Sequence, residues 1–464
     1  MNFQALCGRI FPLCVFALLF HVVSNARAQV PPSPTLGNTN TVFPIDLPTV
    51  LRLANAQNLD IQIARERLEE ARANHESAVE LLFPWVSPGA VYRRHENRIQ
   101  DVVGNILDAD KQSYSVGGTL TAQLDLGDAV YKSLAAKQLV HAADHALESQ
   151  RQDSTLAAAQ GYYDLAKAKV IVDVFNEALS ISEDYQKQLH EAVGLGIAFK
   201  GDELRVQVQT EHYQLALRQA LEQQRVAGAR LAQILHLDSS VEMVPRDTDL
   251  VPLTLVETNA PLDSLVQAAL RSRPELKQSQ ALVAAARDAK NGAVYGPLIP
   301  SVGAQAFGGG LGGGKNDSTG NFAESEDYFV GIGWRIGPGG LFDSGRIHAS
   351  KARLEAARLS GTKVQDEITR QVVESHARAQ SLQDQLATTK QNLATASETL
   401  RLTRERKQFG VGAVLEDIQA QQELTRARSE YLNAVAEFDK AQYSLLKALG
   451  SAGPAREQSR LNQE

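Results

Sequence analysis

The chain has 464 residues, of which 43% are hydrophobic, 6% are aromatic and 22% are charged, and its formal net charge is −7. So few large apolar side chains do not suit a compact enzyme with one large core, whereas long stretches rich in Ala, Gln, Leu, Glu and Arg favour long helices. The acidic balance argues against nucleic acid as a partner, because a phosphate-binding surface needs a basic excess.

Residues 1–28 have the features of a secretory signal. An apolar run follows Arg9, and small residues at the A-x-A spacing end at Ala28, so we predict cleavage after Ala28. A membrane anchor is the weaker alternative, because the apolar run is short for the about 20 residues that span a bilayer. Cys7 and Cys14 both lie in this segment and neither follows a lipoprotein pattern, so we expect a mature chain without cysteine, lipid anchor or Cys-ligated metal.

The rest of the chain repeats itself at an offset of about 215 residues. The segment LRLANAQNLDI, which begins at Leu51, recurs as VQAALRSRPEL from Val266, and the tight-turn sequence Gly194-Leu195-Gly196 recurs as Gly410-Val411-Gly412. A constant offset predicts two structural repeats, each with a helix, a β-hairpin, a very long helix, a tip turn and a second helix. The predicted segments are an extension at 29–46, the first repeat at 47–238 (hairpin about 85–126, tip about 194–201), a linker at 239–261, the second repeat at 262–450 (hairpin about 301–337, tip about 410–413) and a tail at 451–464.

The longest helices have the spacing of coiled coils. Residues 339–453 contain no proline, and Val372, Ala379, Leu386, Leu393 and Leu400 are seven residues apart. This narrow stripe predicts a helix from about Ser344 to Phe409, roughly 100 Å long at 1.5 Å per residue. Taken alone, the stripe fits a rod-like structural coiled coil equally well.

Two segments alternate with the period of a β-strand. From Ser113 to Leu126 every even position is apolar or glycine and every odd position is polar or glycine, and the second hairpin alternates in the same way except at Phe329. Partner strands are expected at 86–98 and 302–308. One face of a soluble sandwich would alternate similarly. If the apolar face instead meets lipid, the lipid-facing residues are Tyr114, Val116, Leu120, Leu124, Tyr328, Val330, Ile332 and Trp334.

The number of strands favours the membrane interpretation and an oligomer. Four strands cannot close into a barrel, and lipid tolerates no open sheet edge, so membrane strands of this chain would have to close between chains. The glycine-rich stretch from Gly308 to Asp327 is expected to be a flexible, hydrated external loop of such a barrel.

Candidate chemistry is sparse. Gly309-x4-Gly314-Lys315 is a near miss to a phosphate-binding loop, but Asn316 replaces the hydroxyl residue that would hold magnesium. His141, Asp144 and His145 share a helix face, which without a third placed ligand indicates a solvated surface rather than a metal site. We therefore expect no enzyme, no catalytic residue, no metal and no cofactor.

Several short motifs, in order and repeated, resemble the TolC-like outer-membrane factor family of efflux and type I secretion systems. The motifs are Asn58-Leu59-Asp60-Ile61 and Arg273-Pro274-Glu275-Leu276, Leu298-Ile299-Pro300, Leu341-Phe342-Asp343-Ser344-Gly345-Arg346, and Phe409-Gly410-Val411-Gly412 followed by Asp417-Ile418-Gln419-Ala420-Gln421. The first repeat departs from the family pattern where Leu126-Gly127-Asp128-Ala129 stands in for the third motif. Its tip departs as well, because Lys200-Gly201 interrupts the expected sequence.

The resemblance implies a mainly α fold with a β-barrel part. Three chains would give a 12-stranded transmembrane barrel, and their coiled-coil helices would form an α-barrel that acts as a periplasmic tunnel. It also implies that the tips, Gly194, Leu195, Gly196, Gly410, Val411 and Gly412, dock a periplasmic adaptor. Near the second tip, Arg404 or Arg406 bonded to Glu416 or Asp417 is a candidate gate, with ordinary solvated helix charge as the alternative.

The function that we expect is therefore an outer-membrane exit duct. A homotrimer in outer-membrane lipid, in a Gram-negative-type cell, would passively conduct substrate from an inner-membrane pump and adaptor to the exterior. The alternative is a secreted structural coiled-coil envelope protein without a pore.

Overall fold

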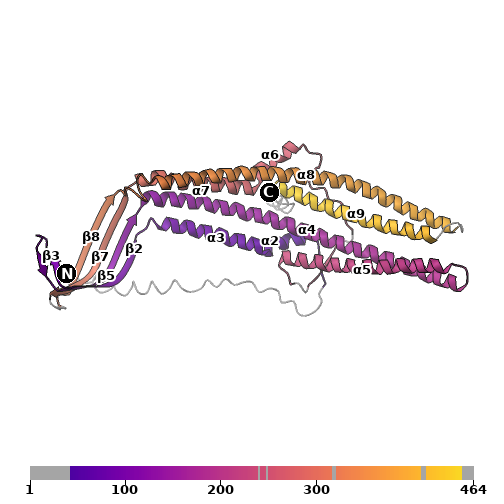
Figure 1. Cartoon of the computed structure of the whole chain (residues 1–464), viewed down its shortest axis with the longest axis horizontal. Helices are drawn as coiled ribbons and strands as arrows, with labels where there is room; N and C mark the ends of the chain where they lie inside the picture. Colours follow the sequence, from indigo (N-terminus) through magenta and orange to yellow (C-terminus); the bar gives the residue numbers. More distant parts are fainter. Residues whose placement is uncertain (1–41, 239–240, 247–248, 316–319, 409–413, 452–464) are drawn as a thin grey trace, which may run out of the picture. The chain divides into compact units, whose positions relative to one another are not determined.

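The computed structural model describes residues 42–238, 241–246, 249–315, 320–408 and 414–451, which belong to one compact unit. Each half of the unit begins with a short helix followed by a longer one (Figure 1). The first half has α2 (Leu47–Gln57) and α3 (Leu59–Glu80), and the second has α6 (Leu262–Ser272) and α7 (Pro274–Tyr295). The matching lengths, 11 and 22 residues in both halves, show the internal repeat directly.

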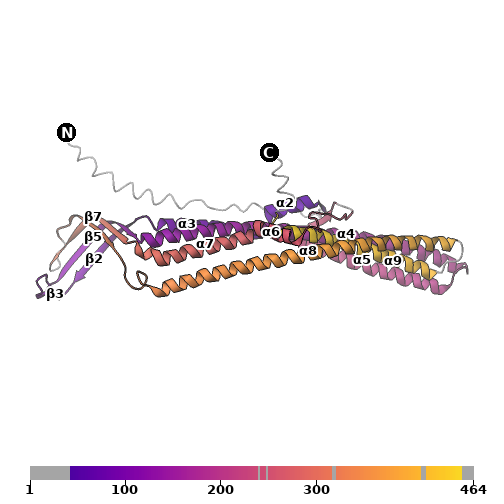
Figure 2. The same ribbon diagram turned by 90° about the horizontal axis from the view of Figure 1, so that it is seen from above.

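The long helices also occur in pairs. In the first half α4 (Leu126–Gly194) is followed by α5 (Lys200–Leu235), and in the second α8 (Ser344–Gln408) is followed by α9 (Val414–Ala448). The 65-residue α8 confirms the long helix predicted from the heptad spacing. Both α3 and α7 lie beside the part of α4 that is nearer the strands, whereas α5 packs against its other part (Figures 1 and 2).

Four strands form one antiparallel sheet in the order β2-β5-β7-β8. They are β2 (Trp85–His95), β5 (Lys111–Leu124), β7 (Ser301–Lys315) and β8 (Ala323–Gly333), so both predicted hairpins are present and share a sheet through the β5–β7 pair. Helices precede β2 and β7 and follow β5 and β8. All four helical connections therefore leave the sheet at the same end.

Two small sheets and a 3-10 turn were not expected from the sequence. β1 (Val42–Ile45) pairs in parallel with β6 (Glu242–Pro245), which joins the segment before the first repeat to the linker. β3 (Arg98–Gln100) and β4 (Ile106–Asp108) form a short hairpin between β2 and β5. The 3-10 turn, η2 (Gly296–Leu298), precedes β7.

The prediction of a flexible loop from Gly308 to Asp327 was wrong over most of its length. β7 continues through the glycines to Lys315, and β8 already begins at Ala323. Aromatic rings account for the glycines, because a Cβ at Gly312 would lie 2.7 Å from the ring of Tyr114 and one at Gly310 would lie 2.1 Å from that of Phe322. These two rings stack with their centroids 5.7 Å apart, so the glycines make room for an aromatic pair.

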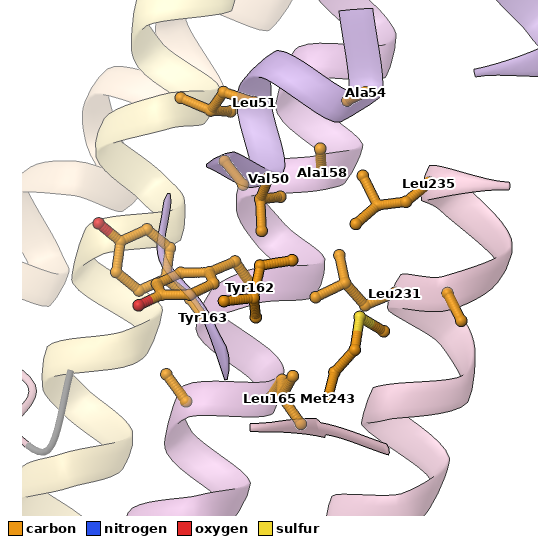
Figure 3. Packing of buried hydrophobic residues seen from close by; sticks show 14 of the residues in the cluster. Val50, Leu51, Ala54, Ala158, Tyr162, Tyr163, Leu165, Leu231, Leu235 and Met243 are labelled. Atoms are coloured by element: carbon orange, nitrogen blue, oxygen red, sulfur yellow. The ribbon is translucent and has the colours of Figure 1, made fainter. Parts of the chain in front are cut away.

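A hydrophobic cluster joins the first helices to the long pair (Figure 3). Val50, Leu51 and Ala54 of α2 pack where α4 and α5 lie side by side, and β6 contributes Met243. Tyr162 and Tyr163 of α4 lie edge to face with centroids 5.7 Å apart, and Tyr163 reaches Tyr443 of α9. The cluster is completed by Ala158, Leu165, Leu231 and Leu235. It fixes the segment before the first repeat to both helix pairs.

The two halves use different residues to stabilise the break between their first two helices. Asn58 caps α3 by accepting the N–H groups of Asp60 and Ile61, and its amide donates to the carbonyl of Ile234 near the end of α5. At the same place in the second half, Arg273 is 2% exposed and donates to Glu275 and Gln371. The Arg273 guanidinium also donates to the last carbonyls of α9, those of Lys447 and Ala448.

The described part of the linker is held against α8 and α9 by buried polar side chains. On α9, Asp439 accepts the N–H of Leu253 at 2.8 Å, and Gln442 accepts the N–H groups of Leu255 and Val256. On α8, the buried His376 donates from Nε2 to the carbonyl of Thr258 at 2.9 Å. Asp439 is completely buried, and this desolvation raises its pKa to about 7.

A substitution at Gly117 tests how closely β5 approaches β7. A Cβ there would lie 2.4 Å from the carbonyl oxygen of Gly308, whereas one at the adjacent Gly118 meets nothing within 4 Å. We expect Gly117→Ala to destabilise the detergent-purified protein by about 1–3 kcal/mol, because the two backbones must separate. Gly118→Ala is the matched control and should be tolerated. Thermal unfolding followed by circular dichroism compares the two, and equal midpoints would contradict the close approach.

Asp439 should make stability depend on pH. The pKa of Asp439 in the folded state is about 7, above the ordinary value of 3.8, so the folded state binds this proton more tightly than the unfolded state does. The contribution of Asp439 to the free energy of unfolding therefore falls as the pH rises from about 4 to 7, and it is constant above pH 7. Asp439→Asn keeps an acceptor for Leu253 but cannot ionise. Relative to this variant, the wild type should lose more than about 1 kcal/mol between pH 5 and pH 8, measured as the free energy of unfolding in urea. The exposed Asp184→Asn is the control, and parallel profiles for wild type and Asp439→Asn would refute the assignment.

Candidate functional site

The strand register separates the side chains of the four-stranded sheet into an apolar face and a polar face. Cross-strand pairing runs from Val86 through Leu120 and Ala306 to Tyr328, which puts the even-numbered residues of all four strands on one side. We call this side the apolar face. It carries seven of the eight residues that the sequence predicted to face lipid, namely Tyr114, Val116, Leu120, Leu124, Tyr328, Val330 and Ile332. Several of them are exposed in the single chain, Val330 by 79%.

The eighth residue, Trp334, lies just beyond the end of β8. Its indole N–H donates to the carbonyl of Leu298 at 3.1 Å, which fixes the ring beside the turn that leads into β7. The ring itself is exposed. Trp334 and Tyr114 thus place amphipathic aromatic side chains near opposite ends of the strands.

The other side of the sheet is the polar face, made of the odd-numbered strand residues. Its polar side chains include those of Thr119, Thr121 and Gln305. Phe329, the one residue that broke the predicted alternation, lies on this face, and a Cβ at Gly331 would lie 3.1 Å from its ring. Phe307 likewise lies against Gly117. Both rings therefore lie against glycine backbone, where no side chain is in the way.

The two outer strands of the sheet are each paired on one side only. Within the described residues, β2 pairs with β5 and β8 pairs with β7, and neither has a second partner. Each therefore presents a row of N–H and C=O groups that can pair with a strand of another chain.

The strand-to-helix junctions of the two halves meet. Arg346, in the motif after β8, donates to the carboxylate of Asp128 at the start of α4 at 2.5 Å. The backbone N–H groups of Arg346 and Gly339 bond Asp343, and these bonds lower the pKa of the Asp343 carboxyl. The atypical first-half junction is thus completed by an arginine of the second half, a contact that the sequence did not reveal because it joins positions 218 residues apart.

The first helical tip exposes apolar side chains. α4 ends at Gly194, and Gly196 turns the chain with a φ of +73°, a conformation that favours glycine. Leu195, Ile197 and Phe199 are 75%, 78% and 73% exposed. The residues predicted at the second tip, Gly410, Val411 and Gly412, lie outside the described residues.

A buried carboxylate connects α4 and α5 next to the first tip. Glu203 of α5 accepts from Lys200 at 2.6 Å, and its other oxygen lies 2.9 Å from Nδ1 of His190 on α4. Hydrogen bonds from Lys200 and His190 hold the pKa of Glu203 below its usual value. The sequence analysis missed this cluster, although a histidine and a Lys-x-x-Glu pair on either side of the turn were a usable signal.

The candidate gate charges lie where α8 and α9 approach the second tip. Arg406 and Glu416 form an ion pair of 3.5 Å across the two helices, and Arg404 donates to Gln421 at 3.1 Å. Arg404 and Asp417 also line a cavity of about 470 Å³ between the two helix pairs, opposite Tyr185 of α4. Each of the four predicted charges thus makes a cross-helix contact or lies at the cavity wall.

The described residues offer little other chemistry. None of their His, Cys, Asp and Glu side chains form a group of three that could hold a metal ion. His141 and Asp144 are exposed on α4. Among the helices of the described segments, none is both long and apolar enough to span a membrane.

Comparison with solved structures gives the same fold at low sequence identity. The Campylobacter jejuni CmeC outer membrane channel is 15% identical with a TM-score of 0.73, over 90% of this chain and 89% of that chain. The Vibrio cholerae outer membrane protein VceC is 18% identical with a TM-score of 0.71, over 87% and 96%. The outer-membrane channel OprN is 19% identical with a TM-score of 0.73, over 88% and 90%. No curated relative matches the chain.

A family model matches both halves separately. The model for outer membrane efflux proteins covers residues 50–235 and 265–451, which together are most of the chain and coincide with the two copies of the helix, strand and long-helix pattern. This family is one of efflux proteins of the outer membrane, not of enzymes. The chain belongs to the outer membrane efflux protein family.

Proposed function

We propose that this chain is one subunit of a trimeric exit duct that passively conducts substrate across the outer membrane. The observation that carries the proposal is the four-stranded sheet, which has an exposed apolar face, a polar face and two open edges. Lipid cannot satisfy the open edges, so the β2 edge of one copy would pair with the β8 edge of the next. Three copies supply 12 strands, an even number within the range of bacterial outer-membrane barrels.

The apolar face has dimensions that suit the outer membrane. The register puts Trp334 two residues beyond the row that joins Leu124, Val302 and Ile332, so it lies about twelve strand positions from the level of Tyr114. At about 3.3 Å per residue and a tilt of about 40°, that separation is roughly 30 Å along the barrel axis. Aromatic residues at this spacing match the two interfacial girdles of a membrane barrel. The residues of the apolar face would contact lipid, and those of the polar face would line the lumen.

The helices would continue the lumen into the periplasm. All four helical connections leave one end of the sheet, and the junction is clamped by Asp128 and Arg346, so closing the strands also brings the helices of three copies together. We propose that the first tip, with its exposed Leu195, and the second, with Val411, dock a periplasmic adaptor that links the duct to an inner-membrane pump. Residues 1–28 would be the signal peptide that directs the chain to the envelope.

The proposed gate is the set of charges near the second tip. Arg406 bound to Glu416, and Arg404 beside Asp417, would hold α8 and α9 in the closed arrangement. These contacts are exposed, and exposed ion pairs stabilise by only about 0–1 kcal/mol each. A docked adaptor could therefore exchange them without a large energetic barrier.

Adjacent residues on β5 test the membrane proposal. Leu120 lies on the apolar face and Thr121 on the polar face. Leu120→Arg should destabilise the assembled barrel by about 2–4 kcal/mol, because the charge would enter the bilayer, and Thr121→Arg should assemble normally. Oligomeric mass in detergent and single-channel conductance in a planar bilayer measure the outcome. A soluble, non-conducting wild-type protein would instead support a structural coiled-coil protein, and normal assembly of Leu120→Arg would contradict the lipid-facing assignment.

The gate charges are tested by conductance in the absence of adaptor. The double variant Arg404→Ser, Arg406→Ser should conduct severalfold more than the wild type, because two contacts between α8 and α9 are removed. Arg401→Ser is the control, since Arg401 pairs along its own helix, with Glu398 and Glu405. An equal rise in Arg401→Ser, or no rise in the double variant, would rule out these residues as the gate.

A further inference from the structure

A cluster of basic side chains lies on the polar face of the sheet, at the end opposite the helices. Cross-strand pairing places His95, Lys111 and Lys315 side by side in one row, and Arg93 is two residues along β2 on the same face. Lys111 and Lys315 are direct neighbours on adjacent strands, an arrangement in which like charges repel each other. The strands thus bring together cations from three segments that are distant in the sequence.

No carboxylate of the described residues neutralises this cluster. Other cations in this region have partners, since Arg94 pairs with Glu96 at 2.6 Å and Arg98 with Asp108 at 3.8 Å, but no ion pair forms at Lys111, Lys315 or Arg93 in the described part of the chain. His95 is half-buried, and its Nε2 has no hydrogen-bond partner there. The described acidic residue of the strands that shares the polar face, Asp327, pairs with Phe307, eight residues along β7 from Lys315. That distance is about 26 Å, well beyond the screening length of about 8–10 Å.

We propose that Arg93, Lys111 and Lys315, with His95, form a basic collar inside the outer end of the duct that binds anionic groups of passing solutes. The proposal rests on the function proposed above, because the polar face lines a lumen only in the closed barrel. Three copies would bring three of each cation around one opening. The ligand chemistry is a phosphate or a carboxylate, which such donors bind by charge-assisted hydrogen bonds. Lipid phosphates would lie on the other side of the barrel wall, at the apolar face, so the collar would act on cargo.

The collar differs in kind from the gate at the helical tips. The gate would control whether the duct is open, whereas a ring of cations raises the local concentration of anions and favours their passage. The inference therefore assigns a charge preference to a duct wall whose other strand side chains on this face, apart from Asp327, are small, neutral or apolar.

The experiment is a measurement of ion selectivity in a neutral phosphatidylcholine bilayer. The full-length trimer is added to one chamber, so that its barrel end enters the other, and the reversal potential is measured in a gradient of dilute KCl. Lys111→Gln, Lys315→Gln should shift the reversal potential toward cation preference, and Lys111→Glu, Lys315→Glu should shift it further. Inositol hexakisphosphate, added on the barrel side, should block the wild type at a concentration at least about tenfold lower than the glutamine variant. The difference should shrink in about 1 M salt.

Arg94→Gln is the control for position, because it removes a positive charge next to Arg93 but on the opposite face of the sheet. It should leave both the reversal potential and the block unchanged. Conducting trimers with the same selectivity and block in wild type and glutamine variant would overturn the collar alone, as would an equal shift in Arg94→Gln. A wild-type protein that forms no channel would overturn the proposed function and the collar with it.

Discussion

The unsatisfied backbone at the two edges of the sheet is the constraint on which the rest of this protein depends. A polypeptide in hydrocarbon must pair every N–H and C=O group internally, and β2 and β8 each leave one row unpaired within the described chain. The apolar face cannot be covered by the helices of the same chain, because all of them leave from one end of the strands. Association of copies is therefore a condition for placing this sheet in a membrane, and the width of the proposed duct would follow from the number of strands that close it.

Neighbouring strands of the sheet approach each other closely, and glycine makes this possible at defined positions. Gly117 faces Gly309 across the β5–β7 pair, where a side chain on either would meet backbone atoms of the other strand. On the apolar face, Gly310 and Gly312 lie under the stacked rings of Phe322 and Tyr114. The same residue type thus serves the strand contact on one face and the aromatic packing on the other. Its abundance in this segment therefore reflects packing against the neighbouring strand and against aromatic rings.

How much of this could be predicted from the sequence depended on the range of the interactions. The heptad spacing gave α8 within a residue of its bounds, and the alternation gave the faces of β5 and β8, because both patterns are local. The pairing of β1 with β6 joins positions about 200 residues apart and has no periodicity to reveal it. The glycine stretch was assigned wrongly because composition alone cannot show that rings cover it. The row that joins His95, Lys111 and Lys315 required the strand register, which no single segment encodes.

The middle of the helical part, beside the linker, and its tip end are held by contacts of different strength, and this difference bears on where the proposed duct would move. Near the linker, the buried Arg273 donates to Glu275, to Gln371 and to the last carbonyls of α9, and removing one partner of such a buried charge costs about 3–5 kcal/mol. Near the second tip, Arg406 and Glu416 are largely exposed and paired at 3.5 Å, which is a weak contact. A conformational change takes place where exchanging contacts costs the least free energy. Motion is therefore expected at the tips of the proposed duct, while the sheet and the linker keep their arrangement.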